Sequence, residues 1–272
     1  MNSIIVIPAR YGSSRLPGKP LREIGGVTLL ARMIQIARRA ASLTKSDYIV
    51  ATDDERIAEY ARSLGARAVL TDPDLPSGSD RCLAAIECLD SRPDLIINLQ
   101  GDAPFTPPEY LANLITAAQC SSADLFTIGI QLEWNELEQL RRQKQSAPFS
   151  GTTCIRSDDG RALWFSKNII PALRGEDVLK QNSPVSPVIR HVGLYGYRFD
   201  ALRRYVDLAP SFYEKLEGLE QLRAIEAGMH VHILLATRPR ISISGIDTPE
   251  DVLRAEALVT QTDDPHYTGI YI

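Results

Sequence analysis

The sequence predicts an α/β fold, a mostly parallel β-sheet with helices on both faces and a smaller inserted antiparallel lobe. Short apolar runs alternate with segments of helical periodicity over the first half of the chain, and this order is typical of a parallel sheet. The apolar runs lack polar–apolar alternation, which indicates strands buried on both faces. The segment at about residues 126–210 instead contains amphipathic or edge-like strands, and it predicts the antiparallel lobe.

Length and composition fit a single domain that spans residues 1–272 and carries the lobe as an insertion. The chain has 272 residues, of which 44% are hydrophobic and 24% charged, enough for a sizeable core. The net charge of −4 gives no general attraction for nucleic acid or a membrane surface, so neither partner is expected. Four cysteines without C-x-x-C spacing, and the lack of a signal peptide or long apolar run, predict a cytoplasmic protein with free thiols.

The first half of the chain supplies the parallel part of the sheet. Strands are expected at Ser3–Ile7, Asp47–Thr52, Ala66–Leu70 and Leu95–Leu99. Helices are expected at Val27–Ala41, from an Asp53 cap to Leu64, at Ser79–Leu89, and from Pro107-Pro108 onward.

The second half contains the lobe and the return to the main sheet. Strands are expected at Phe126–Ile130, Thr152–Arg156, Ala162–Phe165, Val192–Phe199 and Val231–Ala236. Arg174–Pro187 is polar and rich in proline and glycine, which predicts a long loop. Helices are expected at Tyr213–Ala227 and after Asp247-Thr248-Pro249, with either of the first two as the cap. The polar tail after Thr260 is expected to fray.

Three polar segments follow predicted strands, where ligands collect in parallel sheets. They are the loop after Ile7, the pair Asp53-Asp54, and Gln100–Asp102. For Asp53 and Asp54, capping of the following helix explains the carboxylates better than metal binding does.

The loop "IPARYGSSRLPGKPL" (Ile7–Leu21) has a composition suited to a polyphosphate. Glycines permit unusual backbone geometry, successive amides form an anion nest, and cations neutralise phosphate charge. It is not a Walker A loop, because Pro20 stands where Ser or Thr is needed. Its glycines, hydroxyls and cations are Gly12, Gly18, Ser13, Ser14, Arg10, Arg15 and Lys19.

Seven segments in order along the chain resemble motifs of the sugar nucleotidyltransferases, and especially the CMP-KDO synthetases (3-deoxy-manno-octulosonate cytidylyltransferases). Together they cover residues 4 to about 255, and as a set they are highly specific. The segments are Ile7–Leu21, ATDD at Ala51–Asp54, SGSDR at Ser77–Arg81, NLQGD at Asn98–Asp102, HVGLYGY at His191–Tyr197, LEGLEQLR at Leu216–Arg223 and GIDTPED at Gly245–Asp251.

The resemblance implies a Rossmann-like fold of the nucleotide-diphospho-sugar transferase type and a transferase of lipopolysaccharide biosynthesis. The implied reaction joins CTP to the anomeric hydroxyl of KDO or a close 2-keto-3-deoxy sugar acid, giving a CMP-sugar and pyrophosphate. Mg²⁺ is the implied cofactor, because both substrates are anionic and their repulsion must be screened. A homodimer formed through the inserted lobe is also implied.

The resemblance also assigns roles to individual residues. Asp102 and Asp247 are expected to hold Mg²⁺, and with Arg10 and Lys19 they form the expected catalytic set. Helix capping is the competing role for Asp247. The remaining expected contacts are with the nucleotide, at Ala9, Arg10, Ser13, Lys19, Ser77, Arg81 and Gln100, and with the sugar, at His191, Tyr195, Glu220 and Gln221. No general base is assigned.

Three residues depart from the family pattern: Ala103 replaces an acid, Thr153 a lysine, and Lys167 an arginine. These departures leave open an amino-substituted octulosonate or a neuraminate-type acid as the sugar. They also leave open a non-catalytic nucleotide-binding protein of the same fold. Retention of both aspartates, Arg10 and Lys19 argues against the non-catalytic alternative.

Overall fold

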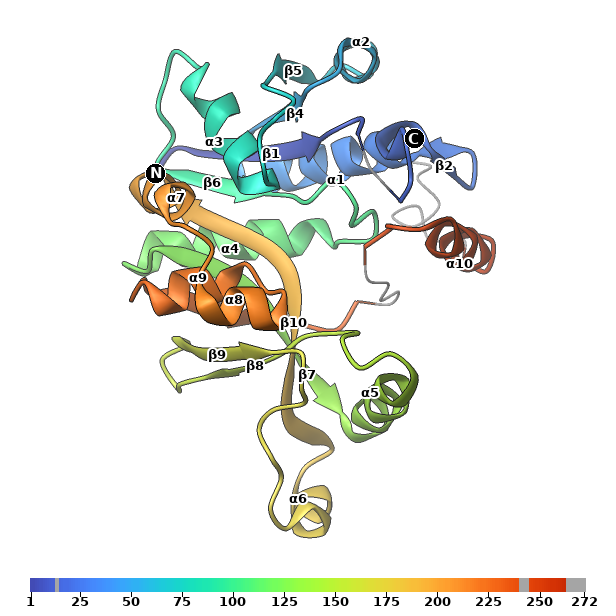
Figure 1. Cartoon of the computed structure of the whole chain (residues 1–272), viewed down its shortest axis with the longest axis vertical. Coiled ribbons are helices and arrows are strands. Elements are labelled where there is room, and N and C mark those ends of the chain that lie inside the picture. The colour runs from blue at the N-terminus through green and yellow to red at the C-terminus, as the bar shows by residue number, and fades with distance from the viewer. Residues whose placement is uncertain (13–14, 240–244, 263–272) are drawn as a thin grey trace.

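A computed structural model describes residues 1–12, 15–239 and 245–262 (Figure 1). One long sheet runs through the molecule in the order β11-β7-β10-β6-β1-β4-β5. Its strands are β1 (Ser3–Ala9), β4 (Asp47–Thr52), β5 (Arg67–Leu70), β6 (Leu95–Asn98), β7 (Leu125–Glu133), β10 (Val185–Arg198) and β11 (Val231–Leu235). β10 pairs antiparallel with both β6 and β7, whereas the other neighbours on this path are parallel. The predicted mostly parallel sheet is confirmed.

Helices cover both faces of the sheet, as predicted. The apolar residues of β1 alternate between two cores: Ile5 and Ile7 belong to one, and Ile4 and Val6 to the other. This alternation explains why the strand is apolar at every position. The first core includes α1 (Leu29–Thr44), α2 (Glu55–Ser63) and α4 (Pro108–Cys120), and the second includes α3 (Gly78–Glu87), α7 (Phe199–Asp207) and α9 (Gln221–Glu226).

The lobe extends from one end of the main sheet (Figure 1). It contains β8 (Thr153–Arg156) and β9 (Ala162–Ser166), which pair antiparallel, and β8 also pairs antiparallel with β10. Helices α5 (Trp134–Ser146) and α6 (Glu176–Asn182) belong to the same region. The centre of the Trp134 ring lies 5.4 Å from the Lys180 ammonium, and the indole N–H donates to the Ser183 carbonyl at 2.8 Å.

The remaining elements are short or lie near the chain ends. They are the 3₁₀ turn η1 (Lys19–Leu21), the hairpin β2 (Glu23–Ile24) and β3 (Val27–Thr28), α8 (Phe212–Glu217) and α10 (Pro249–Val259). No helix within the described ranges is long and apolar enough to cross a membrane. The tail expected to fray lies mostly outside those ranges, because they end at Thr262.

Three predictions about elements were wrong in part. The expected Arg174–Pro187 loop contains α6, and β10 begins at Val185, seven residues earlier than expected. The expected helix Tyr213–Ala227 is two helices, because Gly218 adopts a left-handed φ of 63° and ends α8. Asp54, not Asp53, caps α2 by accepting from the Arg56 N–H at 3.0 Å.

Candidate active site

A cavity of about 310 Å³ lies where β1 and β6 end, beside the N-terminus of α3. Every expected catalytic and nucleotide-contacting residue within the described ranges lines it; Ser13 lies outside those ranges. The lining residues include Ala9, Arg10, Arg15, Lys19, Ser77, Arg81, Gln100, Asp102, Glu220 and Asp247. Segments separated by more than 200 residues of sequence therefore line the same cavity.

Lys19 joins the two aspartates expected to hold metal. Its ammonium donates to Asp102 Oδ2 at 3.1 Å and to Asp247 Oδ1 at 3.0 Å. Lys19 is only 14% exposed, compared with 27% for Asp102 and 39% for Asp247. The Arg15 guanidinium forms a further ion pair with Asp247 at 3.1 Å. Two carboxylates and two cations are thus concentrated at the end of the cavity.

Glycines allow the backbone segments to approach this closely. A Cβ on Gly101 would lie 2.4 Å from the Pro8 carbonyl oxygen, and one on Gly245 would lie 3.0 Å from the Asp102 carboxyl carbon. Gly18, with a left-handed φ of 66°, turns the chain into η1 and presents Lys19. A side chain at Gly101 would push the segment before Asp102 away from β1, and one at Gly245 would push against the Asp102 carboxylate itself.

The N-terminus of α10 fixes Asp247. The cap is Thr248, whose hydroxyl accepts from the Asp251 N–H at 3.2 Å, while Asp251 accepts from the N–H groups of Asp247 and Thr248 at 3.1 and 3.0 Å. Capping, which was the competing role for Asp247, is therefore performed by its neighbour. The Asp247 carboxylate is left to face Lys19 and Arg15.

Arg81 is almost fully buried, at 2% exposure, and lines this first cavity. Its guanidinium donates to Thr71 Oγ1 at 2.5 Å and lies 3.6 Å from Asp53 Oδ2. Burial lowers the pKa of Arg81, and nearby Asp53 opposes that shift. The Ser77 hydroxyl is occupied as the cap of α3, where it accepts from the Ser79 and Asp80 N–H groups and pairs with the Asp80 carboxylate.

A second cavity, of about 390 Å³, adjoins the first. All four expected sugar-contacting residues line it, namely His191, Tyr195, Glu220 and Gln221. Gln100, Asp102 and Glu220 belong to the walls of both cavities. The structure thus brings the expected nucleotide residues and the expected sugar residues to two adjoining cavities that share Asp102.

His191 is held as a neutral imidazole. Burial, and secondarily the Lys167 charge, lowers its pKa to about 3. The Thr127 hydroxyl lies 2.9 Å from His191 Nε2 and 2.8 Å from the Leu194 carbonyl. Because that hydroxyl donates its single proton to the carbonyl, it accepts from Nε2–H. The other ring nitrogen, Nδ1, is left as a hydrogen-bond acceptor.

Tyr195 and Gln221 form a buried polar pair in the second cavity. The Tyr195 hydroxyl donates to Gln221 Oε1 at 3.0 Å. Among the described residues, the buried Gln221 amide nitrogen has no hydrogen-bond partner. A buried donor without a partner costs free energy, so a ligand acceptor here would recover it.

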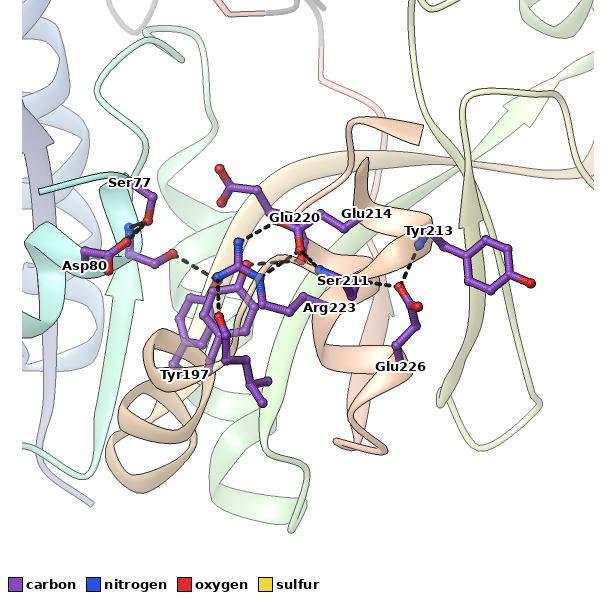
Figure 2. A network of polar contacts seen from close by, with 12 residues as sticks. Ser77, Asp80, Tyr197, Ser211, Tyr213, Glu214, Glu220, Arg223 and Glu226 are labelled. Atoms are coloured by element: carbon purple, nitrogen blue, oxygen red, sulfur yellow. Dashed lines mark hydrogen bonds and ion pairs between the residues drawn. The ribbon is translucent and has the colours of Figure 1, made fainter. Parts of the chain in front are cut away.

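Glu220 lies beside the ion pair between Glu214 and Arg223, whose charged atoms are 2.5 Å apart. Figure 2 shows the Glu220 carboxylate outside this network and extended toward the side on which Ser77 lies. Its side chain is exposed to the cavities, yet partial desolvation by the surrounding protein raises its pKa. Glu220 therefore presents a hydrogen-bond acceptor at the junction of the two cavities.

Two cations in the second cavity were not among the predicted site residues. Lys167, predicted only as a departure from the family pattern, and Arg190 both line it. Burial lowers the pKa of each. Within the described part of the chain neither side chain has a hydrogen bond or an ion pair. The sequence signal that could have identified Arg190 is its position directly before His191, an expected sugar-contacting residue.

The other two departures differ in their placement. Ala103 also lines the second cavity. Thr153 is buried, and its hydroxyl donates to the Asn168 carbonyl at 2.7 Å and accepts from the Ile170 N–H at 3.1 Å. Thr153 thus holds the segment that follows Lys167.

The donor set at Asp102 and Asp247 fits a magnesium ion. Carboxylate oxygens suit Mg²⁺, which commonly uses one or two carboxylates and takes its other ligands from phosphates and water. In the described ranges no group of three or more acidic, histidine or cysteine side chains converges as a complete metal cage. Two aspartates on a cavity lined by Arg10, Arg15 and Lys19 match the partial shell that Mg²⁺ completes with phosphate oxygens and water.

Comparison with known proteins identifies the family of this chain and supports the predicted fold. A family model described as cytidylyltransferase matches residues 4–232, and the chain belongs to this family. The 3-deoxy-manno-octulosonate cytidylyltransferase of Maricaulis maris is 38% identical over 260 residues, covering 95% of this chain and 97% of the relative. The enzyme of that name from Vibrio parahaemolyticus is 34% identical, covering 96% and 99% of the two chains.

A solved structure gives the same result. The chain resembles CMP:2-keto-3-deoxy-manno-octonic acid synthetase complexed with CTP, with a TM-score of 0.78 and 32% sequence identity. The match covers 96% of this chain and 99% of that one. The predicted family, fold and enzyme class are confirmed.

Proposed function

We propose that the chain joins CTP to the anomeric hydroxyl of 3-deoxy-manno-octulosonate, or a close 2-keto-3-deoxy sugar acid. The hydroxyl oxygen bonds to the α-phosphorus, the bond to the β-phosphate breaks, and pyrophosphate and a proton leave. The products are CMP-sugar and pyrophosphate. The observation that carries this proposal is the meeting of two cation-lined cavities at Asp102.

The first cavity, named here the nucleotide cavity, supplies the groups that a triphosphate needs. Arg10 and Lys19 bind the β- and γ-phosphates and stabilise the departing pyrophosphate by charge. Asp102 and Asp247 would hold Mg²⁺, which supplies charge screening and polarises the phosphoryl oxygens. Lys19, already bonded to both carboxylates, keeps them together before substrates arrive.

The second cavity supplies the groups that a sugar acid needs. Lys167 and Arg190 have no ion-pair partner in the described part of the chain and are suited to a carboxylate. The neutral His191 Nδ1 and the Glu220 carboxylate accept from sugar hydroxyls. The Gln221 amide donates to a sugar oxygen. A neutral sugar would leave both desolvated cations without a counter-charge, and this favours an acid.

Substrate identity is tested by pyrophosphate release with CTP, Mg²⁺ and a panel of sugar acids. We expect turnover with 3-deoxy-manno-octulosonate. Because Ala103 and Lys167 both line the second cavity, the panel includes an amino-substituted octulosonate and a neuraminate-type acid. A higher kcat/KM for one of these would reassign the sugar. No release across the panel would favour a non-catalytic nucleotide-binding protein.

We further propose that the chain forms a homodimer through the lobe and acts in the cytoplasm, where CTP is made. The support for the dimer is an exposed apolar surface where β9 meets α8. Phe212 is 66% exposed, and the Trp164 ring of β9 packs edge-on against the Tyr213 ring of α8 at 5.1 Å. Leu216 extends this surface along α8.

A further inference from the structure

Lys167 is the cation of the second cavity whose backbone is held from both sides by charged side chains. Glu217 Oε2 accepts from the Lys167 N–H at 2.7 Å. The Lys144 ammonium donates to the Lys167 carbonyl oxygen. A single peptide segment is thus fixed by a carboxylate on one side and an ammonium on the other, and the Lys167 side chain extends from it into the cavity wall.

Lys144 connects two segments that lie on that wall. It belongs to the last turn of α5 and also donates to the carbonyls of Ser150 and Gly151, at 2.5 and 3.2 Å, in the loop between α5 and β8. Gly151 and Lys167 both line the second cavity. Among the described residues no carboxylate is bonded to Lys144, and its hydrogen bonds there all go to carbonyl oxygens, which hold it as a partly buried charge.

Glu217 connects Lys167 to another segment that lines the second cavity. Its other oxygen, Oε1, accepts from the Ser166 hydroxyl at 2.8 Å. The residues that follow it, Gly218, Leu219 and Glu220, all line the second cavity. Glu217 therefore ties the end of β9 to the segment that carries the Glu220 acceptor.

We propose that Lys144 and Glu217 are positioning residues that fix Lys167 for contact with the sugar carboxylate. This inference deepens the proposed function and rests on it. Neither residue touches the cavity in the described structure, since neither belongs to its wall. Both act through the backbone of Lys167. Their loss is expected to weaken sugar binding without affecting the nucleotide cavity, which they do not contact.

The first experiment compares Lys144→Met with Lys144→Arg and with a matched control, Lys180→Met. Lys180 pairs with Glu176 at 2.8 Å in the same lobe but does not line the cavity. We expect the KM for the sugar acid to rise on the order of tenfold to a hundredfold in Lys144→Met, because small displacements at a binding site are costly. The KM for CTP should stay unchanged. Arginine, with several N–H donors, should restore much of the sugar affinity.

A double-mutant cycle tests whether the effect passes through Lys167. If it does, Lys144→Met adds little to the defect of Lys167→Met, because the two changes remove the same contact. Glu217→Ala should behave like Lys144→Met, whereas Glu217→Gln keeps a hydrogen-bond acceptor and should be milder. Thermal unfolding identifies any variant that fails to fold. If Lys144→Met or Glu217→Ala does so, the KM for the sugar acid is compared between the unchanged chain and the conservative variants Lys144→Arg and Glu217→Gln.

The outcomes separate this inference from the function on which it rests. Suppose that the unchanged chain shows turnover, but Lys144→Met raises the KM values for sugar and CTP equally. That result would overturn the positioning role alone, and so would additive effects of Lys144→Met and Lys167→Met in the double-mutant cycle. An unshifted sugar KM in Lys144→Met would do the same. Absence of turnover by the unchanged chain with every sugar acid would overturn the proposed function, and the inference with it.

Discussion

Among single residues, Asp102 is the most informative because it belongs to both cavities and is bonded to Lys19. Asp102→Asn keeps the shape of the side chain and removes its charge. We expect the fold to persist and metal-dependent turnover to fall by about a hundredfold or more, or ~3 kcal/mol in the barrier. Pyrophosphate release at saturating CTP measures this, with circular dichroism as the check on folding.

The control for this change is Asp158→Asn, an exposed aspartate in the turn between β8 and β9 that lines neither cavity. Its turnover should equal that of the unchanged chain. Near-normal turnover in Asp102→Asn would show that the metal site is placed wrongly.

His191 gives a prediction for pH. Its pKa is about 3 when folded, because it is buried and near Lys167, against about 6.5 when unfolded. The unfolded chain therefore binds the extra proton first as the pH falls. The stability contributed by neutral His191 is complete above about pH 6.5 and is lost progressively toward pH 3.

The measurement compares the free energy of unfolding of the unchanged chain and His191→Gln at pH 7 and pH 5. Glutamine does not titrate. Between pH 7 and pH 5 the free energy of unfolding should therefore fall by about 1–2 kcal/mol more in the unchanged chain than in His191→Gln. A difference that does not change with pH would mean that the imidazole titrates normally when folded.

Among the elements, α10 joins stability to the site, because its N-terminus holds Asp247. Thr248→Ala removes the hydroxyl that accepts from the Asp251 N–H. We expect the free energy of unfolding to fall by about 1 kcal/mol, and turnover to fall because Asp247 is held less firmly. Thr116→Ala, on exposed α4 surface, is the control. Equal losses in the two variants would argue against a role for the cap.

The elements that the sequence predicted best are those with strong local signals. The Asp47–Thr52 strand has the predicted bounds, since its apolar run is buried and fully paired. The helix expected from Val27 begins at Leu29, because Val27 and Thr28 pair with Ile24 and Glu23. The first half of β10 was missed because Pro184 and Pro187 resemble loop residues, and only tertiary pairing with β7 reveals a strand there.

In the candidate site, too, some features have a local signal in the sequence and others depend on tertiary contacts. Motifs indicated the residues around both cavities, because their spacing along the chain is local information. The unpaired state of Lys167 and Arg190, and the two-sided hold on the Lys167 backbone, depend on segments about 20 to 50 residues apart. A single sequence carries no signal for such contacts until the fold brings them together.

For the whole molecule, the remaining question is how the exposed apolar surface on β9 and α8 is covered. A patch that contains Phe212 and Leu216, one turn apart on α8, is costly to leave in water. If a second copy covers it, light scattering at micromolar concentration will give a dimer mass. Phe212→Glu should give a monomer, because association would bury an unpaired charge. Leu43→Glu, at an equally apolar exposed position on α1, should remain a dimer. A monomer mass for the unchanged chain, or a dimer that tolerates Phe212→Glu, would contradict assembly through this face.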